Sequence, residues 1–308
     1  MSRKLKADLL LIFCTLIWGA TFVVVKDALA NASVFVFLAL RFLLATVVLI
    51  FMYGRQLRTA DASGFRAGAL MGCCMFGGYA FQTAGLALTT PSKAAFITGF
   101  FVVFVPLLLA LLGLRRAPLW VWLGALSAFI GLYFLAVPPS GLAVLNRGDL
   151  LVLACAFMFA VHVISIGHYS VRYSVGALTL IQVAVTTLFT ILCVPIFALV
   201  GIEQPHLMWT RGLIVGVVTT GVLATAVAFS LQVWAQQYTS ANHAAIIFTL
   251  EPVFAGLTSF FFYHERLSAR SLLGAALILG GILVAELLGP TPASESSVPP
   301  GETLQRLT

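Results

Sequence analysis

The chain has 308 residues, of which 61% are hydrophobic and only 9% are charged, and its formal net charge is +7. A soluble domain carries about a quarter charged residues and roughly half apolar ones, so this composition excludes a globular protein with a water-facing surface. We therefore predict an all-α integral membrane protein. The positive charge does not indicate a nucleic-acid partner, because the basic residues stand mainly at the ends of apolar segments, where they orient helices in a bilayer.

Ten apolar segments follow in chain order, each close to the length of about 20 residues that a helix needs to cross a membrane. Short polar or turn-forming stretches separate them. The first segment is too long for a secretory signal and lacks a small-residue cleavage pattern, which predicts a retained helix. Residues 289–308 are rich in Pro, Ser and Glu and predict a disordered C-terminal tail. The predicted spans are 8–28, 33–53, 65–88, 92–112, 117–137, 149–168, 175–200, 211–234, 240–263 and 269–288.

The two halves of the chain repeat each other. ADLLLIFCTLIWG at 7–19 lies over GDLLVLACAFMFA at 148–160 with an offset of 141 residues. From the third span onward the offset is 150 residues. The pairs that result include Asp8 with Asp149, Arg41 with Gln182, Gln82 with Gln232, Gly124 with Gly274, and Gly131 with Gly281.

Each half holds five predicted spans, and an odd number makes the second half enter the membrane upside down relative to the first. Residues 8–137 and 149–286 are therefore predicted to be two inverted five-helix repeats around a central cavity. Inverted repeats are typical of secondary transporters, whose substrate site lies near the midplane between the halves.

The Lys and Arg residues predict the orientation in the membrane. With the N-terminus inside, eight basic residues of the first half fall in the cytoplasm and only Lys26, Lys93 and Arg147 fall outside. The second half does not support this orientation, but early helices usually dominate. Both termini are predicted to be cytoplasmic. The eight inner residues are Arg3, Lys4, Lys6, Arg55, Arg58, Arg66, Arg115 and Arg116.

Arg41 lies near the centre of the second span, where a charge costs at least ~2.5–3.5 kcal/mol on insertion scales. It must therefore face the bundle interior, a partner or water. Two roles stay open: a structural anchor bonded to backbone carbonyls, and a binding group for an anionic part of a substrate.

Glu251 and Pro252 interrupt the apolar run AAIIFTLEPVFAGL at 244–257. Pro252 has no N–H, so it frees a carbonyl one turn earlier and loosens the helix there. We predict that Glu251 faces a cavity and that Pro252 supplies a hinge. The alternative is a buried Glu251 paired with Arg41 or His162 for stability. A carboxyl group that exchanges a proton at this depth would also allow proton coupling.

The prolines of the two halves do not superpose. At the offset of 150, Pro106 falls on Gly256, and Phe101 falls on Glu251. The second half therefore contributes an acid where the first contributes an aromatic ring. Pro106 is the hinge candidate of the first half.

Other polar or aromatic residues within the spans are further cavity candidates. His162, which matches Thr21, is either a hydrogen-bonded helix contact or part of the transport path. Trp18 either stacks on a flat substrate or packs in the core. Gln82 and Gln232 are related by the repeat and either bond across helices or bind substrate. The complete candidate set is Trp18, Arg41, Gln82, His162, Gln232 and Glu251.

Motifs for other kinds of chemistry are missing from the sequence. There is no GxxxxGK[ST], so neither an ATP-driven motor nor an ATPase partner is implied. HERLS at 264–268 is not HExxH, and no G-x-S-x-G occurs. The five cysteines lie in apolar runs without metal-ligand spacing. No enzyme activity, metal or cofactor is predicted.

The chain resembles the drug/metabolite transporter superfamily, and within it the EamA-type ten-helix exporters. The resemblance covers residues 8–137 and 149–286, and it rests on the order, spacing and duplication of several stretches. His264 stands where a Gly is more usual in the family. The stretches are IWGATFVVVK (17–26), LALRFLLA (38–45), LALTTPSKAAFITGFFVVFVPLLLALL (86–112), LEPVFAGL (250–257), YHERLS (263–268) and LLGAALILGGILVAE (272–286).

The resemblance implies a basket of helices around a central cavity in an inner membrane. It also implies a carrier of small organic solutes, often an exporter of amino acids or related metabolites. The leading interpretation is a secondary transporter that works by alternating access, with a small-molecule substrate and the lipid bilayer as its partners. Its oligomeric state stays open. The alternative is a proton-coupled effluxer of cationic or lipophilic drugs that uses Glu251. A membrane enzyme or a non-transporting scaffold is a distant third.

Overall fold

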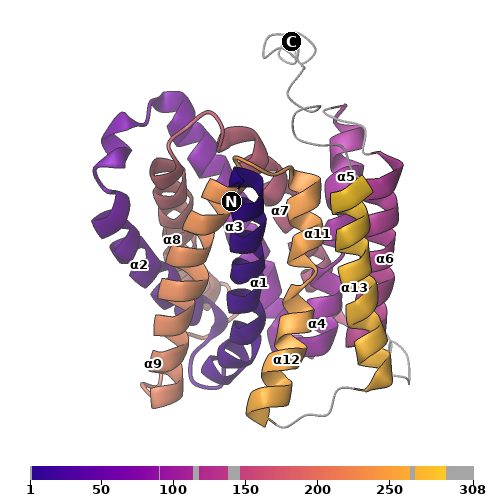
Figure 1. The fold of residues 1–308 in the computed structure, drawn as a ribbon. Coiled ribbons are helices and arrows are strands. Elements are labelled where there is room, and N and C mark those ends of the chain that lie inside the picture. The colour runs from indigo at the N-terminus through magenta and orange to yellow at the C-terminus, as the bar shows by residue number, and fades with distance from the viewer. Residues whose placement is uncertain (1, 90, 114–117, 138–145, 264–267, 289–308) are drawn as a thin grey trace.

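A computed structural model describes residues 2–89, 91–113, 118–137, 146–263 and 268–288. In these ranges the chain folds into helices without any strand, apart from one isolated bridge between Ala32 and Leu207. The helices form one bundle, with α1 (Arg3–Ala28) near its middle (Figure 1). The predicted tail at 289–308 lies outside the described residues.

The other helices of the first half are α2 to α6, with a 3₁₀ turn η1 between α2 and α3. They are α2 (Val34–Tyr53), η1 (Gln56–Thr59), α3 (Ala62–Leu88), α4 (Pro91–Thr98), α5 (Phe101–Leu111) and α6 (Leu119–Ala136). The second half comprises α7 (Arg147–Tyr169), α8 (Val175–Leu199), α9 (Arg211–Val218), the π-helical stretch η2 (Thr219–Val227), α10 (Ala228–Ala235), α11 (Ala241–Phe248), α12 (Glu251–Tyr263) and α13 (Ala269–Leu288).

The helices confirm an all-α membrane fold, and the ten predicted spans fit it. Among the described residues, five continuous helical segments are long and apolar enough to cross a membrane: Arg3–Ala28, Val34–Tyr53, Arg147–Tyr169, Val175–Leu199 and Arg211–Ala235. Shorter apolar segments accompany them at Phe96–Leu111, which spans the end of α4 and all of α5, and at Leu119–Phe134 and Ala269–Ala285.

The fourth and ninth spans are each broken into two helices. α4 and α5 are separated at Gly99 and Phe100, and α11 and α12 at Thr249 and Leu250. At both breaks the backbone tightens to bonds between residues three apart, such as Phe100 N to Ile97 O at 3.1 Å and Leu250 N to Ile247 O at 3.0 Å.

The two breaks fall at equivalent positions of the repeat. In the first half, Val102 stands where the second half has Pro252, and the helix breaks there as well. Loosening of the helix by Pro252 therefore does not by itself explain a break at this position of the repeat. Pro106 lies inside α5, beyond the break. Whether either proline acts as a hinge stays a prediction.

Close packing joins α6 and α13, which lie side by side in Figure 1. A Cβ on Gly124 would lie 2.7 Å from the Gly281 carbonyl oxygen, and one on Gly131 would lie 2.5 Å from that of Gly274. Small residues allow helix backbones to approach this closely in a membrane. These contacts are reciprocal, since the repeat pairs Gly124 with Gly274 and Gly131 with Gly281.

A second reciprocal contact joins α2 and α8. Thr46 and Thr187 are equivalent at the offset of 141, and their hydroxyl oxygens lie 2.7 Å apart. A two-fold relation between the halves would give contacts of this kind. The inverted arrangement in the membrane itself stays a prediction.

Candidate functional site

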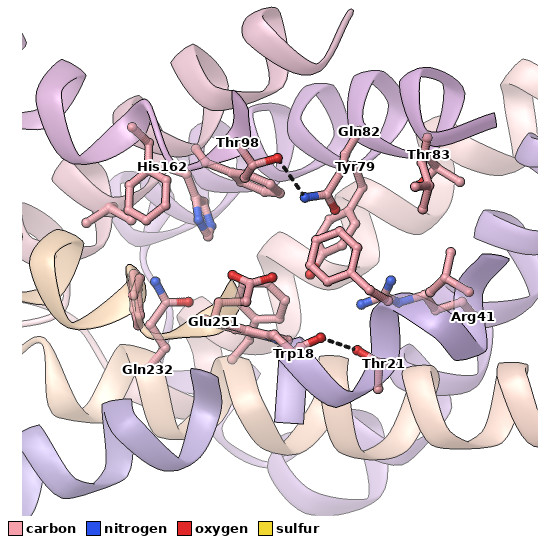
Figure 2. Close-up of a pocket in the computed structure, with 18 residues that line it drawn as sticks. Trp18, Thr21, Arg41, Tyr79, Gln82, Thr83, Thr98, His162, Gln232 and Glu251 are labelled. Atoms are coloured by element: carbon pink, nitrogen blue, oxygen red, sulfur yellow. Dashed lines mark hydrogen bonds between the residues drawn. The ribbon is translucent and has the colours of Figure 1, made fainter. Parts of the chain in front are cut away.

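A central cavity of about 760 Å³, including its opening to solvent, lies between the two halves of the bundle. Helices α1 to α5 line it from the first half, and α7, α10, α11 and α12 from the second. All six residues predicted from the sequence line this one cavity (Figure 2). They are Trp18, Arg41, Gln82, His162, Gln232 and Glu251.

Glu251 is the first residue of α12, directly after the break in the ninth span. Its side chain is half-buried and lies near the middle of the cavity in Figure 2. In the part of the chain that the structure describes, no hydrogen bond or ion pair reaches its carboxyl group. The alternative of a pair with Arg41 or His162 is therefore not found. The carboxyl group is left available to a ligand.

Arg41 is 4% exposed and lies at one end of the cavity (Figure 2). Its Nε donates a hydrogen bond to Thr225 Oγ1 at 2.9 Å. The guanidinium carbon lies 4.4 Å from the centre of the Tyr79 ring and 5.3 Å from that of Phe42. Among the described residues, the charge is thus held by a hydroxyl and two rings, and not by the backbone carbonyls of the anchor hypothesis. It still borders the cavity.

The π-helical stretch η2 holds two of the candidate residues in place. Thr225, which accepts the bond from Arg41, itself donates to the Thr220 carbonyl at 2.8 Å. Trp18 Nε1 donates to the Ala224 carbonyl at 2.9 Å. Single π-type turns are frequent at functional sites, because they redirect side chains and carbonyls out of the regular helical ladder. The apolar run TTGVLATAV gave no sign of this irregularity.

The three remaining candidates are tied into amide and hydroxyl contacts. His162 Nε2 lies 2.8 Å from Gln182 Oε1, and Gln232 Nε2 donates to Gln236 Oε1 at 3.0 Å. Gln82 Nε2 lies 3.5 Å from Thr98 Oγ1. His162 is thus a hydrogen-bonded helix contact that also lines the cavity, and its part in a transport path stays a prediction.

Aromatic rings form much of the cavity wall. Trp18 packs against Phe229 and Phe248 with ring centres 5.4 and 5.3 Å apart, and Tyr79 lies 6.1 Å from Phe229. Sequence reasoning missed Tyr79, Phe229 and Phe248, because single rings do not stand out among 25 Phe and 7 Tyr.

The repeat itself could have identified most of the lining. Positions that superpose at offsets of 141 and 150 border the cavity from both sides, so the cavity lies where equivalent surfaces of the halves meet. The pairs are Trp18 with Phe159, Thr21 with His162, Phe22 with Val163, Tyr79 with Phe229, Gln82 with Gln232, Thr98 with Phe248, and Phe101 with Glu251.

A smaller cavity of about 230 Å³, including its opening, adjoins the central one and shares with it Phe22, Thr98, Phe101, Phe248 and Glu251. Pro252 lines only this smaller space. Within the described ranges, no group of three His, Cys, Asp or Glu side chains is arranged to hold a metal ion.

The chain is similar to known membrane transporters in sequence. Residues 5–137 and 146–287 both match the EamA-like transporter family. An uncharacterized transporter of Archaeoglobus fulgidus is 37% identical over 286 residues, which cover 92% of this chain and 87% of the relative. The uncharacterized transporter YoaV of Bacillus subtilis is 23% identical over 292 residues, which cover 91% and 96% of the two chains.

A solved crystal structure has the same fold. It superposes with a TM-score of 0.77 at 20% identity, over 95% of this chain and 99% of the other. The helical bundle, the two family matches and the archaeal relative agree, and this multi-pass membrane protein is a transporter that belongs to the EamA-like transporter family.

Proposed function

We propose that this protein is a secondary transporter that exports small organic metabolites, amino acids or related compounds among them, by alternating access. The observation that carries the proposal is a central cavity that a carboxyl group, Glu251, and a guanidinium group, Arg41, face from different halves of the chain. No described residue forms a hydrogen bond or ion pair with the Glu251 carboxyl group. Ionisable groups at membrane depth are costly and typically mark a substrate pathway.

The chemistry of the cavity favours a zwitterionic substrate. Arg41 offers planar donors that suit a carboxylate, and Glu251 offers an acceptor that suits an ammonium group. Trp18, Phe229 and Phe248 supply an apolar wall for the rest of the molecule. No ion pair within 4 Å joins Arg41 to Glu251, so a substrate carrying both charges would satisfy both groups at once.

Counterflow into liposomes tests this proposal. Purified protein is reconstituted, and exchange of a labelled panel of amino acids and metabolites is compared for wild type, Arg41→Gln and Glu251→Gln. We expect wild type to exchange at least one zwitterion, and each variant to lose roughly tenfold or more, because each removes a charge-assisted hydrogen bond. Retention of wild-type exchange in both variants would contradict this use of the cavity.

A proton-coupled effluxer of cationic or lipophilic drugs is the second candidate. It is favoured by the half-buried Glu251 carboxyl group, to which no described residue is bonded. Glu251 would then bind the proton and the cation in turn, and Arg41 would be purely structural. Transport driven by a pH gradient, lost in Glu251→Gln and kept in Arg41→Gln, would favour this candidate over the first.

We also propose a cellular location and an orientation in the membrane. The protein would lie in the cell membrane with both termini in the cytoplasm, and residues 8–137 and 149–286 would be inverted repeats. Support for the orientation comes from the basic residues of the first half. The reciprocal contacts of α6 with α13 and of α2 with α8 support the repeat.

A further inference from the structure

The cavity is deeper toward one end of the bundle than toward the other. We define the Lys26 end by the last turns of α1 and α3, and the Gln236 end by the last turn of α7 and the residues that follow α10. Val25 and Leu86, at the Lys26 end, line the cavity. Their repeat equivalents, Ile166 and Gln236, are buried and do not line it. The cavity therefore reaches the Lys26 end and stops short of the Gln236 end.

One long side chain ties two helices together at each end. At the first end, Lys26 Nζ on α1 donates to the Leu86 carbonyl of α3 at 2.8 Å. At the other end, Gln236 Nε2 donates to the Val163 carbonyl of α7 at 2.9 Å. The repeat equivalent of Lys26 is Gly167, and that of Gln236 is Leu86. The two halves thus tie helices together at the two ends with different groups.

The Gln236 end carries more of these bonds. Gln232 donates to the Gln236 side chain, and Gln237 donates to the Ser170 carbonyl. These amides join α7 to α10 and to the segment that follows it. They lie at the end that the cavity does not reach.

A threonine–aspartate pair is formed at the Lys26 end and unformed at the Gln236 end. Thr89 Oγ1 donates to Asp149 Oδ1 at 2.7 Å and so joins the end of α3 to the start of α7. The repeat equivalents of these residues are Thr239 and Asp8, which lie at the Gln236 end.

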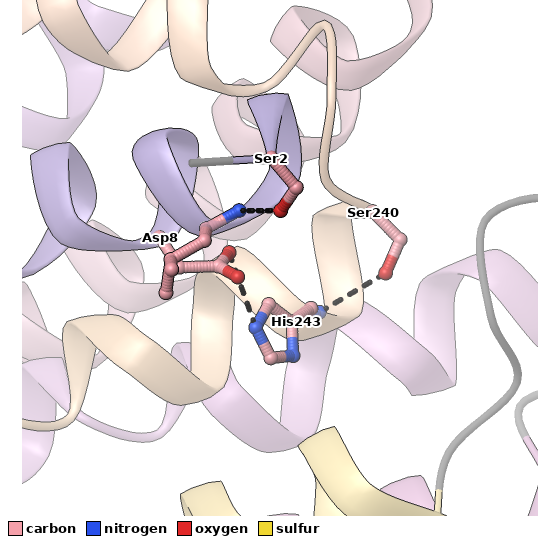
Figure 3. A network of polar contacts seen from close by, with 5 residues as sticks. Ser2, Asp8, Ser240 and His243 are labelled. Carbon is pink, nitrogen blue, oxygen red and sulfur yellow. Dashed lines mark hydrogen bonds and ion pairs between the residues drawn. The ribbon is translucent and has the colours of Figure 1, made fainter.

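The unformed pair leaves the Thr239 hydroxyl without a hydrogen-bond partner among the described residues, and it leaves Asp8 Oδ1 with an ion-pair contact to His243 in place of a hydrogen bond. Thr239 Oγ1 and Asp8 Oδ1 are both buried, and neither has a hydrogen-bond partner among the residues that the structure describes. Figure 3 shows that Asp8 points toward His243, whose Nε2 lies 3.3 Å from Oδ1 in an ion-pair contact. Buried polar atoms without a hydrogen bond are costly and call for an explanation.

We propose that Thr89–Asp149 and Thr239–Asp8 are two alternating latches. The first is formed while the cavity opens at the Lys26 end, and the second forms when it opens at the Gln236 end. This inference rests on the proposed function, because it requires alternation between two states. In the second state the halves exchange roles: Asp8 accepts a hydrogen bond from Thr239, Thr89 separates from Asp149, and Gln236 releases the Val163 carbonyl.

The two latches are chemically identical, since each pairs a threonine hydroxyl with an aspartate carboxylate. A carrier needs two states of similar free energy, since a large bias would trap it in one. Hydroxyl-to-carboxylate bonds of the same kind at both ends keep the two states balanced. The present state then lacks the Thr239–Asp8 bond at the Gln236 end, and the other state would lack the Thr89–Asp149 bond at the Lys26 end.

The test uses matched variants that remove one hydroxyl each. In a cysteine-free background in lipid nanodiscs, Val25→Cys reports access at the Lys26 end and Ile166→Cys reports access at the Gln236 end. The measured quantity is the rate of reaction with a water-soluble maleimide. We expect the reporter at 25 to react faster than the reporter at 166 when both threonines are present.

The two threonine variants are expected to act in opposite directions. Thr89→Val removes the latch that is formed and should raise the rate at 166 about tenfold, while lowering the rate at 25. Thr239→Val removes the latch of the other state and should lower the rate at 166 by a similar factor. Thr89→Ser and Thr239→Ser keep the hydroxyl and should keep the parent rates.

The latches would be overturned if the two valine variants shift the maleimide reaction rates in the same direction or not at all. They would also be overturned if the serine variants behave like the valine variants. The labelling needs no substrate, so it separates the two proposals. Opposite shifts without any counterflow would leave the latches standing and contradict the proposed transport of amino acids and related metabolites. Counterflow without opposite shifts would remove the latches alone.

Discussion

At the scale of single residues, the cavity separates two opposite charges that could have paired with each other. Arg41 is held by the Thr225 hydroxyl and by the rings of Tyr79 and Phe42. Glu251 has no such support among the described residues. An internal ion pair would have cancelled both charges, whereas this arrangement leaves the carboxyl group able to bind a ligand.

Trp18 allows a test of how the cavity wall is fixed. Trp18→Phe keeps a ring but removes the hydrogen bond to the Ala224 carbonyl of η2. We expect a loss of about 0.6–1.7 kcal/mol in the free energy of unfolding, the range measured for hydrogen bonds between membrane helices. The measurement is thermal unfolding in detergent. Trp120→Phe is the control, since Trp120 is 41% exposed; equal losses in both variants would contradict the assigned role.

At the scale of helices, Glu251 is placed by the packing of α12 on α1. A Cβ on Gly19 would lie 2.5 Å from the Glu251 carbonyl oxygen and 3.0 Å from the Ala255 nitrogen. Only a residue without a side chain allows this approach, and the atoms it would meet belong to a helix backbone that cannot rotate away.

Gly19→Ala should therefore push α12 away from α1. We expect it to destabilise the protein by about 1–3 kcal/mol, as overpacking does, and to lower counterflow because Glu251 moves with α12. Gly280→Ala is the matched control, because a Cβ there meets nothing within 4 Å; it should be neutral or stabilising by up to about 1 kcal/mol. Thermal unfolding of the two variants decides, and a Gly19→Ala protein as stable as wild type would contradict the packing account.

The breaks in the helices mark a limit of sequence reasoning at this scale. The break before Glu251 was predictable, because Pro252 removes a backbone donor in an apolar run. The equivalent break at Gly99 and Phe100 has no proline beside it, and the π-helical stretch at 219–227 has neither proline nor charge. Packing between elements decides such irregularities, and local sequence carries little of that information.

At the scale of the whole molecule, the repeat organises both the fold and the cavity. The ten spans could be predicted because each is an apolar run of about the length that crosses a membrane. The polar cavity candidates could be predicted because polar residues inside such spans are rare and costly. The aromatic wall could not be chosen from composition, although Tyr79 and Phe229 superpose in the repeat. The halves differ at the repeat position that is Phe101 in the first half and Glu251 in the second, and this difference places a carboxyl group in the cavity.

The central claim is that this cavity is the transport path, and chemical modification within it tests the claim most directly. Thr98 lines the cavity beside Gln82 and is 5% exposed. In a cysteine-free background, Thr98→Cys is treated with a positively charged methanethiosulfonate, and counterflow is compared before and after. The control is the cysteine-free protein with Thr98 intact, treated with the same reagent.

We expect modification at position 98 to reduce counterflow roughly tenfold or more, and saturating substrate to slow the modification, because the adduct and the substrate compete for one space. The same treatment of the cysteine-free control should leave counterflow unchanged. Complete modification at position 98 with undiminished counterflow would contradict the account, since substrate would then cross the membrane by another path.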